Sequence, residues 1–296
     1  MRLVTFKKPN TIGTHIGALR EDGAVLDLAK VDPALAGGNM PAFISGGAAA
    51  LEHARKAALT APVAEGASLC APIPRPPKNV FCVGKNYYEH AAEFAGSGFD
   101  ASAKEVVPEA PVVFSKPATS IIAPGEPILS HLDSSGSTDY EGEVAVVIGK
   151  GGRGIAKADA LSHVFGYTIV NDVTARTLQH KHRQWVLGKG IDSFCPMGPA
   201  ILTADEVPDP TKLRLTTHVN GEKRQDSHTS KMIFNIKQII EQLSIGFTLV
   251  PGDIIMTGTP EGVGYAMVPP KTLVAGDVIR CEVDGIGSLT TTVKAQ

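Results

Sequence analysis

The sequence contains few cysteines and few aromatic residues: four cysteines and an aromatic fraction of 5% in 296 residues. Cys70, Cys82, Cys195 and Cys281 are widely separated and form neither a CxxC pair nor a zinc-type spacing. This scarcity argues against a disulfide-rich scaffold or a zinc site and favours reduced, buried thiols in a cytosolic protein. A catalytic Cys195 stays open as an alternative, although the sequence suggests no partner for it.

An excess of one charge and long hydrophobic runs are also missing. The net charge is −2 with a pI near 6.5, and the densest basic cluster, residues 181–183, is too short for a nucleic-acid-binding face. No stretch approaches the roughly 18 apolar residues of a membrane helix, and residues 1–10 hold no apolar signal region. We therefore expect a cytoplasmic protein with neither nucleic acid nor membrane as a partner.

What is present is an ordinary globular mixture, with 43% hydrophobic and 20% charged residues. Residues 1–75 predict a small N-terminal α+β domain, in which short apolar runs indicate strands and the Ala-rich Gly47–Leu59 indicates a helix. Ala71–Pro77 contains four prolines in seven residues and is interpreted as a stiff linker. Residues 79–296 then form a second domain.

The second domain is rich in strand-like runs such as Glu143–Ile148 and Tyr167–Val173, and its clearest helical patterns are Tyr87–Phe94 and Ile233–Leu243. Because strands do not alternate with long helices, the pattern predicts a mainly β fold with α-helices (α+β) rather than a doubly wound parallel sheet. Ala95–Ala110 shows little periodicity and is expected to be a lid or binding loop, with a disordered surface insertion as the alternative.

The strongest local signal is a pair of glutamates, Glu141 and Glu143, directly before the apolar run Val144–Ile148. Side chains alternate along a strand, so the two carboxylates share a face and repel each other. A hard divalent cation relieves this repulsion, although a solvent-facing strand start explains the pattern equally well. Asp172 ends a second apolar strand, where either the same ion or a helix N-cap would satisfy a buried carboxylate.

Three further positions suggest proton transfer and substrate binding. His90 and Glu93 are three residues apart, hence neighbours on one helix face, and form either a catalytic base or an ordinary surface pair. Lys189, flanked by glycines, is suited to hold a substrate carboxylate or an enolate oxygen. Thr259 lies in a Gly-rich turn whose amides suit a carboxylate and whose spacing does not match a dinucleotide-binding motif.

Taken together and in order, the motifs of residues 79–296 resemble the fumarylacetoacetate hydrolase family. The motifs that carry the resemblance are VGKNYYEHAAE, VVFSKP, DYEGEVAVVIG, GYTIVNDVTAR, QWVLGKGIDSFCPMGP, VNGE, PGDIIMTGTPEGVG and GDVIRCEVDGIG. The N-terminal part resembles the additional domain of the longer bacterial members. The chain is more similar to the fumarylacetoacetate hydrolase domain-containing 2 and bacterial 2-oxo acid hydrolase branch than to the tyrosine-catabolic enzyme.

The resemblance implies a mixed β-roll catalytic fold, a homodimer, and one Mg²⁺ or Mn²⁺ per chain held by Glu141, Glu143 and Asp172. It implies that His90 and Glu93 are a catalytic dyad on a lid and that Lys189 is catalytic beside the metal. The residues that it implies in substrate contact are Tyr87, Arg176, Gln184, Lys189 and Thr259.

The resemblance also implies chemistry through a metal-bound enolate of a 2-oxo or diketo acid. With the dyad present, we predict a metal-dependent hydrolase that cleaves a C–C bond in an acylpyruvate or β-diketo acid. The alternative on the same site is an oxaloacetate decarboxylase or a keto–enol tautomerase or isomerase of a 2-oxo acid. The sequence does not predict the acyl group.

Overall fold

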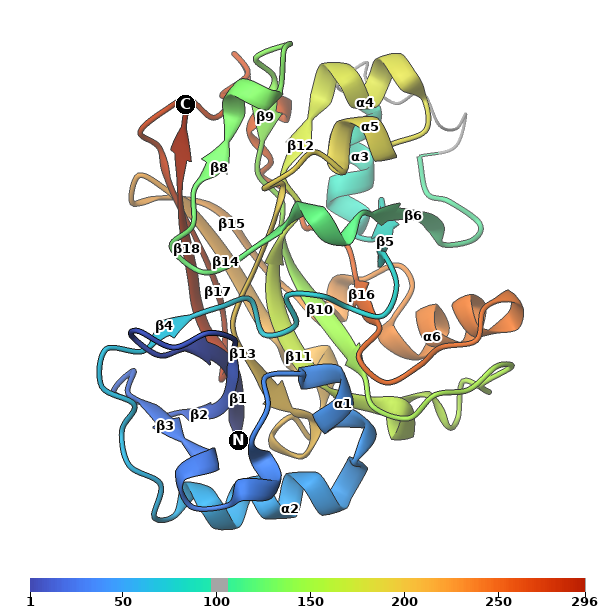
Figure 1. Ribbon diagram of the computed structural model, residues 1–296. Helices are drawn as coiled ribbons and strands as arrows, with labels where there is room; N and C mark the ends of the chain where they lie inside the picture. Colours follow the sequence, from blue (N-terminus) through green and yellow to red (C-terminus); the bar gives the residue numbers. More distant parts are fainter. Residues whose placement is uncertain (97–105, 296) are drawn as a thin grey trace.

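One large β-sheet organises the molecule in the computed structural model, which describes residues 1–96 and 106–295 (Figure 1). In spatial order its main strands are β3 (Val25–Asp27), β2 (His15–Leu19), β1 (Arg2–Lys7), β13 (Cys195–Thr203), β11 (Val164–Asn171), β10 (Gly142–Ile148), β16 (Ile254–Met256), β5 (Val80–Gly84) and β6 (Val112–Lys116). Two short strands join its path, β4 (Ser68–Leu69) beside β1 and β7 (Ile121–Ile122) beside β13.

The remaining elements form a second sheet, a small ribbon and several helices. The second sheet consists, in order, of β15 (Glu222–His228), β14 (Arg214–Val219), β17 (Val278–Val283), β18 (Gly287–Lys294) and β8 (Ile128–Leu129), and the ribbon pairs β12 (Thr174–Ala175) with β9 (Thr138–Asp139). The α-helices are α1 (Met40–Ser45), α2 (Gly47–Ala58), α3 (Tyr88–Gly96), α4 (Arg176–His182), α5 (Val186–Lys189) and α6 (Ile236–Gly246). None of the helices in the described ranges is long and apolar enough to cross a membrane.

The central strand β10 is buried on both faces, which explains its continuous apolar sequence. Val144 and Val146 pack into the core shared with the second sheet. Ala145 and Val147 point to the other face, into a core that includes Phe43 of α1. The strand that carries the predicted metal-binding motif is therefore held rigidly by packing from two sides.

The fold class predicted from the sequence, mainly β with α-helices, is confirmed. The strand β13 was not predicted, because Pro196 and Pro199 interrupt its sequence and proline is rarely found inside a sheet. The predicted lid, Ala95–Ala110, lies mainly at residues 97–105, outside the described residues.

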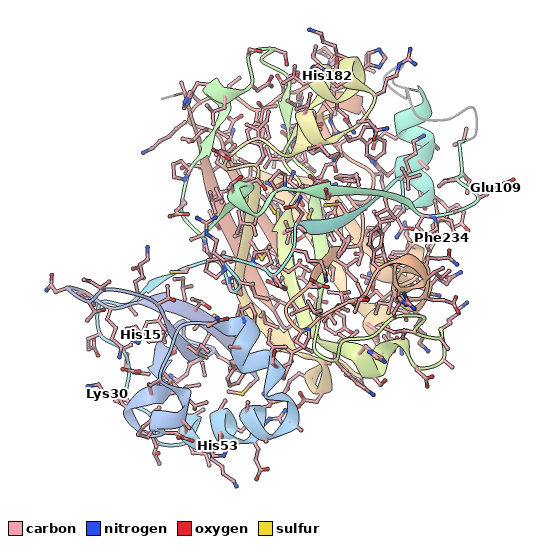
Figure 2. The ribbon with its side chains drawn as sticks, turned by 45° about the vertical axis from the view of Figure 1, so that its right-hand side comes forward. His15, Lys30, His53, Glu109, His182 and Phe234 are labelled. Carbon is pink, nitrogen blue, oxygen red and sulfur yellow. The ribbon has the colours of Figure 1, made fainter. Side chains whose placement is uncertain are left out.

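The N-terminal residues extend the large sheet, because β1 pairs antiparallel with β13. Whether residues 1–75 and 79–296 are separate domains stays a prediction. Figure 2 shows His15, Lys30 and His53 at one end of the molecule and His182 of α4 at the opposite end. The helices α3, α4 and α5 gather at this second end, away from α1 and α2 (Figure 1).

Candidate metal centre and active site

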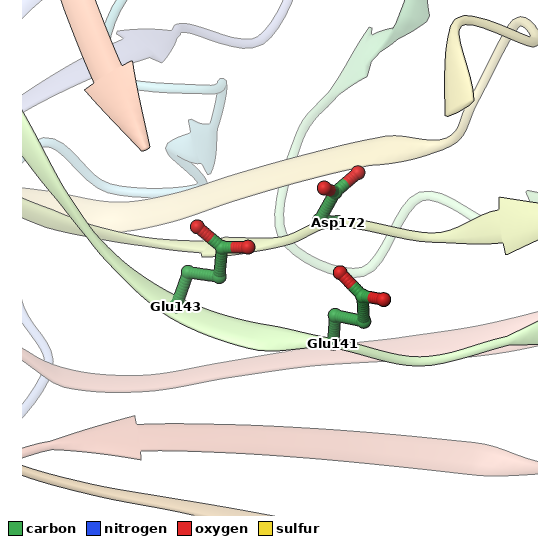
Figure 3. A group of neighbouring side chains, drawn as sticks. All are labelled: Glu141, Glu143 and Asp172. Atoms are coloured by element: carbon green, nitrogen blue, oxygen red, sulfur yellow. The ribbon is translucent and has the colours of Figure 1, made fainter. Parts of the chain in front are cut away.

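Three buried carboxylates converge where β10 and β11 lie side by side (Figure 3). Glu141 directly precedes β10 and Glu143 lies within it, so the two side chains leave the strand on the same face. Asp172 follows the last residue of β11, and its backbone N–H donates a 2.7 Å hydrogen bond to the Glu141 carbonyl. One carboxylate oxygen from each residue lies within 4.8 Å of the other two. The structure thus brings together all three predicted metal ligands.

The ammonium group of Lys189 bridges two of these carboxylates. Its Nζ donates to Glu141 Oε2 and Asp172 Oδ2, both at 2.8 Å, and to Thr174 Oγ1 at 2.9 Å. All three ammonium protons are therefore used within the protein. This geometry gives the buried Lys189 a role in holding the cluster together, and its predicted role toward substrate stays a prediction.

Arg176, at the start of α4, binds the carboxylate oxygen of Glu141 that Lys189 does not contact. Its Nη1 donates to Glu141 Oε1 at 2.5 Å, while Nε and Nη2 donate to Asp139 Oδ2 at 3.0 and 2.8 Å. Asp139 also accepts the backbone N–H groups of Gly264 and Tyr265, each at 3.0 Å. Because the guanidinium is occupied by these buried partners, the observed contacts are those of a residue that orients Glu141.

Lys116 was not predicted as part of the site. Its Nζ donates to Asp172 Oδ1 and, at 3.0 Å, to the carbonyl of Val173. The side chain is fully buried and comes from β6, 56 residues before Asp172. Asp172 therefore has one lysine on each carboxylate oxygen.

The three carboxylates differ strongly in their electrostatic surroundings. Burial alone raises the pKa of Glu141, but the positive charges of Lys189 and Arg176 outweigh it and lower this pKa to about 2. Burial raises the pKa of Glu143 well above its ordinary value, and the negative charges of Asp172 and Glu141 add to the rise. Glu143 is thus the carboxylate whose charge the surrounding protein compensates least.

This donor set fits a hard divalent cation. Carboxylate oxygens are the ligands preferred by Mg²⁺ and Mn²⁺, and three of them converge here in a buried position. A cation at this position would supply the positive charge that Glu143 lacks. Such a cation would favour the ionised form of Glu143, which burial and the neighbouring carboxylates disfavour.

The predicted dyad lies on α3, and its histidine lines the same pocket. His90 Nδ1 lies 3.3 Å from Glu93 Oε2, and the backbone N–H of Gly262 donates to both Glu93 oxygens at 3.1 and 3.3 Å. His90 is buried and lines the pocket of the three carboxylates. The side chains of the dyad and of the metal cluster are thus assembled in one place.

The side chains fill the pocket tightly and leave a cavity volume of about 10 Å³. Some of the residues that line the pocket were not predicted as site residues from the sequence. They lie on the elements that surround the three carboxylates. The pocket's lining residues are Val83, Gly84, Lys85, His90, Glu141, Glu143, Asp172, Gln179, Trp185, Lys189 and Thr259.

Only some of the residues predicted to contact substrate line the pocket. Thr259 lines the pocket, but its hydroxyl donates to the Gly142 carbonyl at 3.0 Å. Gln184 is exposed and is not among the lining residues, whereas Gln179 is buried there. Gln179 follows Arg176 by three residues on α4, a spacing that would have indicated a shared face. Tyr87 is buried outside the lining, and its hydroxyl has no partner among the described residues.

A pocket lined by buried carboxylates, beside a histidine–carboxylate pair, is the arrangement of an enzyme active site. The sequence model of the family described as fumarylacetoacetate (FAA) hydrolase C-terminal matches residues 79–294. The chain belongs to the fumarylacetoacetate hydrolase family of enzymes, as its motifs predicted.

Individual proteins are similar to this chain over nearly its whole length. The chain is 44% identical to the oxaloacetate tautomerase YisK of Bacillus subtilis over 291 residues, which cover 93% of this chain and 94% of that protein. It is 41% identical over 300 residues to the mitochondrial oxaloacetate tautomerase fahd2 of Xenopus laevis, with 99% and 90% covered. A maleylpyruvate hydrolase from Sphingobium sp. SYK-6, solved with manganese(II) and pyruvate, superposes with a TM-score of 0.77 at 31% identity, covering 99% of both chains.

Proposed function

We propose that this protein is a metal-dependent keto–enol tautomerase of a small 2-oxo acid, with oxaloacetate as the first candidate substrate. The observation that carries the proposal is the pocket that the three carboxylates share with His90, whose Nδ1 lies 3.3 Å from Glu93 Oε2. Names of relatives similar over nearly the whole chain support the same reaction. They favour the tautomerase alternative over the hydrolase that we first predicted from the motifs.

Tautomerisation requires only that one proton leaves a carbon and another reaches an oxygen. In the keto-to-enol direction, His90 Nε2 takes a proton from the carbon next to the keto group, and that electron pair forms the C=C bond of the enol. Glu93 accepts a hydrogen bond from the N–H of His90 Nδ1, which keeps the imidazole oriented and raises its basicity. The proton that His90 Nε2 has taken is then delivered to the former keto oxygen, which restores His90 and completes the reaction without consuming water.

The remaining residues provide the charge that this reaction needs. A divalent cation held by Glu141, Glu143 and Asp172 would stabilise the negative charge that develops on the keto oxygen. Lys189, Arg176 and Lys116 hold Glu141 and Asp172 in position, in the manner of the outer-shell contacts of other metal sites. Mg²⁺ and Mn²⁺ both suit these ligands.

The proposal is tested by offering the protein freshly dissolved enol-oxaloacetate and following the loss of the enol's ultraviolet absorbance. We expect enzyme-dependent acceleration and, in D₂O, faster exchange of the C3 hydrogens in the NMR spectrum. Formation of pyruvate and CO₂ without faster tautomerisation would indicate a decarboxylase and would contradict the proposal.

Acylpyruvate hydrolysis is the second candidate, because a histidine–carboxylate dyad also suits water activation. The structural similarity to a maleylpyruvate hydrolase favours it, whereas the names of relatives similar over nearly the whole chain favour tautomerisation. Incubation with acetylpyruvate and maleylpyruvate separates the two reactions. Release of pyruvate at a rate above that of oxaloacetate tautomerisation would establish hydrolysis as the main activity.

A further inference from the structure

A buried glutamine from the second sheet contacts the strand that carries the metal ligands. Gln225, on β15, is 1% exposed. Its Oε1 accepts the backbone N–H of Gly142 at 3.0 Å, and its Nε2 donates to Thr259 Oγ1 at 2.8 Å and to the carbonyl of Pro260 at 2.9 Å. Gly142 separates Glu141 from Glu143, so this side chain holds the backbone between two candidate metal ligands.

The hydrogen bonds form a closed ring. Gly142 donates to Gln225, Gln225 donates to Thr259, and the Thr259 hydroxyl donates back to the Gly142 carbonyl at 3.0 Å. Both backbone groups of Gly142 are therefore satisfied by the two side chains of one ring. A buried network in which every member is paired holds its parts rigidly, and loss of one member leaves the others unsatisfied.

The turn that Gln225 holds also contacts the candidate catalytic groups. Gly258 donates its N–H to Glu143 Oε2 at 2.7 Å, and Gly262 donates its N–H to Glu93. Residues 257–264, the Gly-rich turn, thus reach a metal ligand at one end and the dyad at the other.

The path of this turn is fixed by its glycines. Gly258 and Gly262 have φ values of +100° and +99°, which side-chain-bearing residues rarely adopt. A Cβ at Gly262 would lie 2.0 Å from the carbonyl oxygen of Arg224, the residue before Gln225. The turn therefore packs directly on β15, and a shift of β15 would be transmitted to it.

We propose that Gln225 is a positioning residue that fixes the position of the metal cluster relative to the proton-transfer dyad. It does so through Gly142 on one side and the Gly-rich turn on the other. Gln225 is not among the residues that line the pocket, so it acts through Glu141, Glu143 and Glu93 rather than by touching substrate. The inference rests on the proposed function, because it concerns the same metal site and dyad.

The test replaces Gln225 by methionine, which fills similar space without hydrogen-bonding groups. We expect Mn²⁺ affinity, measured directly by electron paramagnetic resonance of the free ion, to fall by about 10- to 100-fold, as for other outer-shell changes. We expect kcat for oxaloacetate tautomerisation at saturating Mn²⁺ to fall as well. Glu93→Gln should cost less in the Gln225→Met background than in the wild type, because the dyad is already displaced.

Thr217→Val is the matched control. Thr217, on β14, packs against the same glycine, since a Cβ on Gly142 would lie 2.2 Å from its Oγ1. Its hydroxyl donates to Cys281 Sγ at 3.8 Å and, among the described residues, makes no hydrogen bond to the metal strand or to the Gly-rich turn. We expect this variant to retain the wild-type Mn²⁺ affinity and kcat, whatever it loses in thermal stability.

The outcomes are distinguishable. If folded Gln225→Met binds Mn²⁺ as tightly as Thr217→Val does, or if its effect on kcat and that of Glu93→Gln are additive, the positioning role is wrong. If Gln225→Met does not fold, Gln225→Asn takes its place, because it stays polar but is too short to reach both partners, and the same loss is expected. If the wild-type chain binds no Mn²⁺ while its 2-oxo acid turnover is intact, the metal part of the proposed function fails, and this inference fails with it.

Discussion

Asp226 and Asp172 are each paired with two cations, but their side chains differ in exposure to solvent. Asp226, on β15, binds Arg214 and Lys223, and 28% of its side chain is exposed. Asp172, at the end of β11, binds Lys116 and a second lysine, and only 1% of its side chain is exposed. Water screens a surface pair, whereas removing charges from water is costly even when they are paired.

The difference between the two regions indicates where the protein keeps buried charges, which are unfavourable for stability, because they serve a function. The surface cluster of β14 and β15 needs no explanation beyond solubility. The buried cluster concentrates Asp139, Glu141, Glu143 and Asp172 with three basic side chains inside the protein. Strongly perturbed, buried charges in a pocket are characteristic of active sites, and here they coincide with the family's motifs.

The largest expected effect comes from removing His90, the proposed proton-transfer group beside the buried carboxylates. His90→Ala should lower kcat for oxaloacetate tautomerisation by about 10²- to 10⁴-fold, the usual contribution of a general acid–base residue. Mn²⁺ affinity should stay near the wild-type value. His182→Ala, at an exposed position on α4, is the control. Equal kcat values in the two variants would remove the dyad from the mechanism.

The next effect compares the two ion clusters directly. Lys116→Met leaves a buried carboxylate with one of its two lysines, so the free energy of unfolding should fall by about 3–5 kcal/mol, as when other buried pairs are broken. Lys223→Met, in the exposed cluster, should produce no resolved change. Urea denaturation of both variants at one pH measures the difference. Similar small losses in both would mean that burial does not distinguish the clusters.

The smallest expected effect concerns whether solvent and reagents reach the buried cysteine thiols. Burial raises the pKa of the Cys195 thiol to about 12, with a further contribution from Asp172, and burial raises that of Cys281 to about 12 as well. Since the thiolate is the reactive form, both thiols should resist alkylation by iodoacetamide at pH 8 in the folded protein and react once it is unfolded. Mass spectrometry of the two residues reads this out. Rapid alkylation in the folded state would show that water reaches the interior.

The central features of the site could be predicted from local patterns in the sequence. Alternation along a strand places Glu141 beside Glu143, and helical spacing places His90 beside Glu93, so each pair follows from residues that are close in the chain. Asp172 could be placed only as a strand end, and its meeting with the glutamates followed from the pairing of β10 with β11.

The supporting residues could not be predicted in the same way. Lys116 reaches Asp172 across 56 residues, and Gln225 reaches Gly142 across 83. These contacts depend on which strands pair and on how the two sheets pack, and no local pattern encodes either. Gln184 was selected for its place in a motif, whereas the structure puts Gln179 in the pocket because α4 turns that face inward.

The most direct test of the account is the dependence of tautomerase activity on a divalent cation. The protein is treated with a chelator, freed of it, and assayed with enol-oxaloacetate before and after addition of Mg²⁺ or Mn²⁺. The account predicts that activity is lost on chelation and returns with either ion in the wild type, but not in Asp172→Ala. Full activity in the chelated protein would contradict the assignment of Glu141, Glu143 and Asp172 as the metal centre.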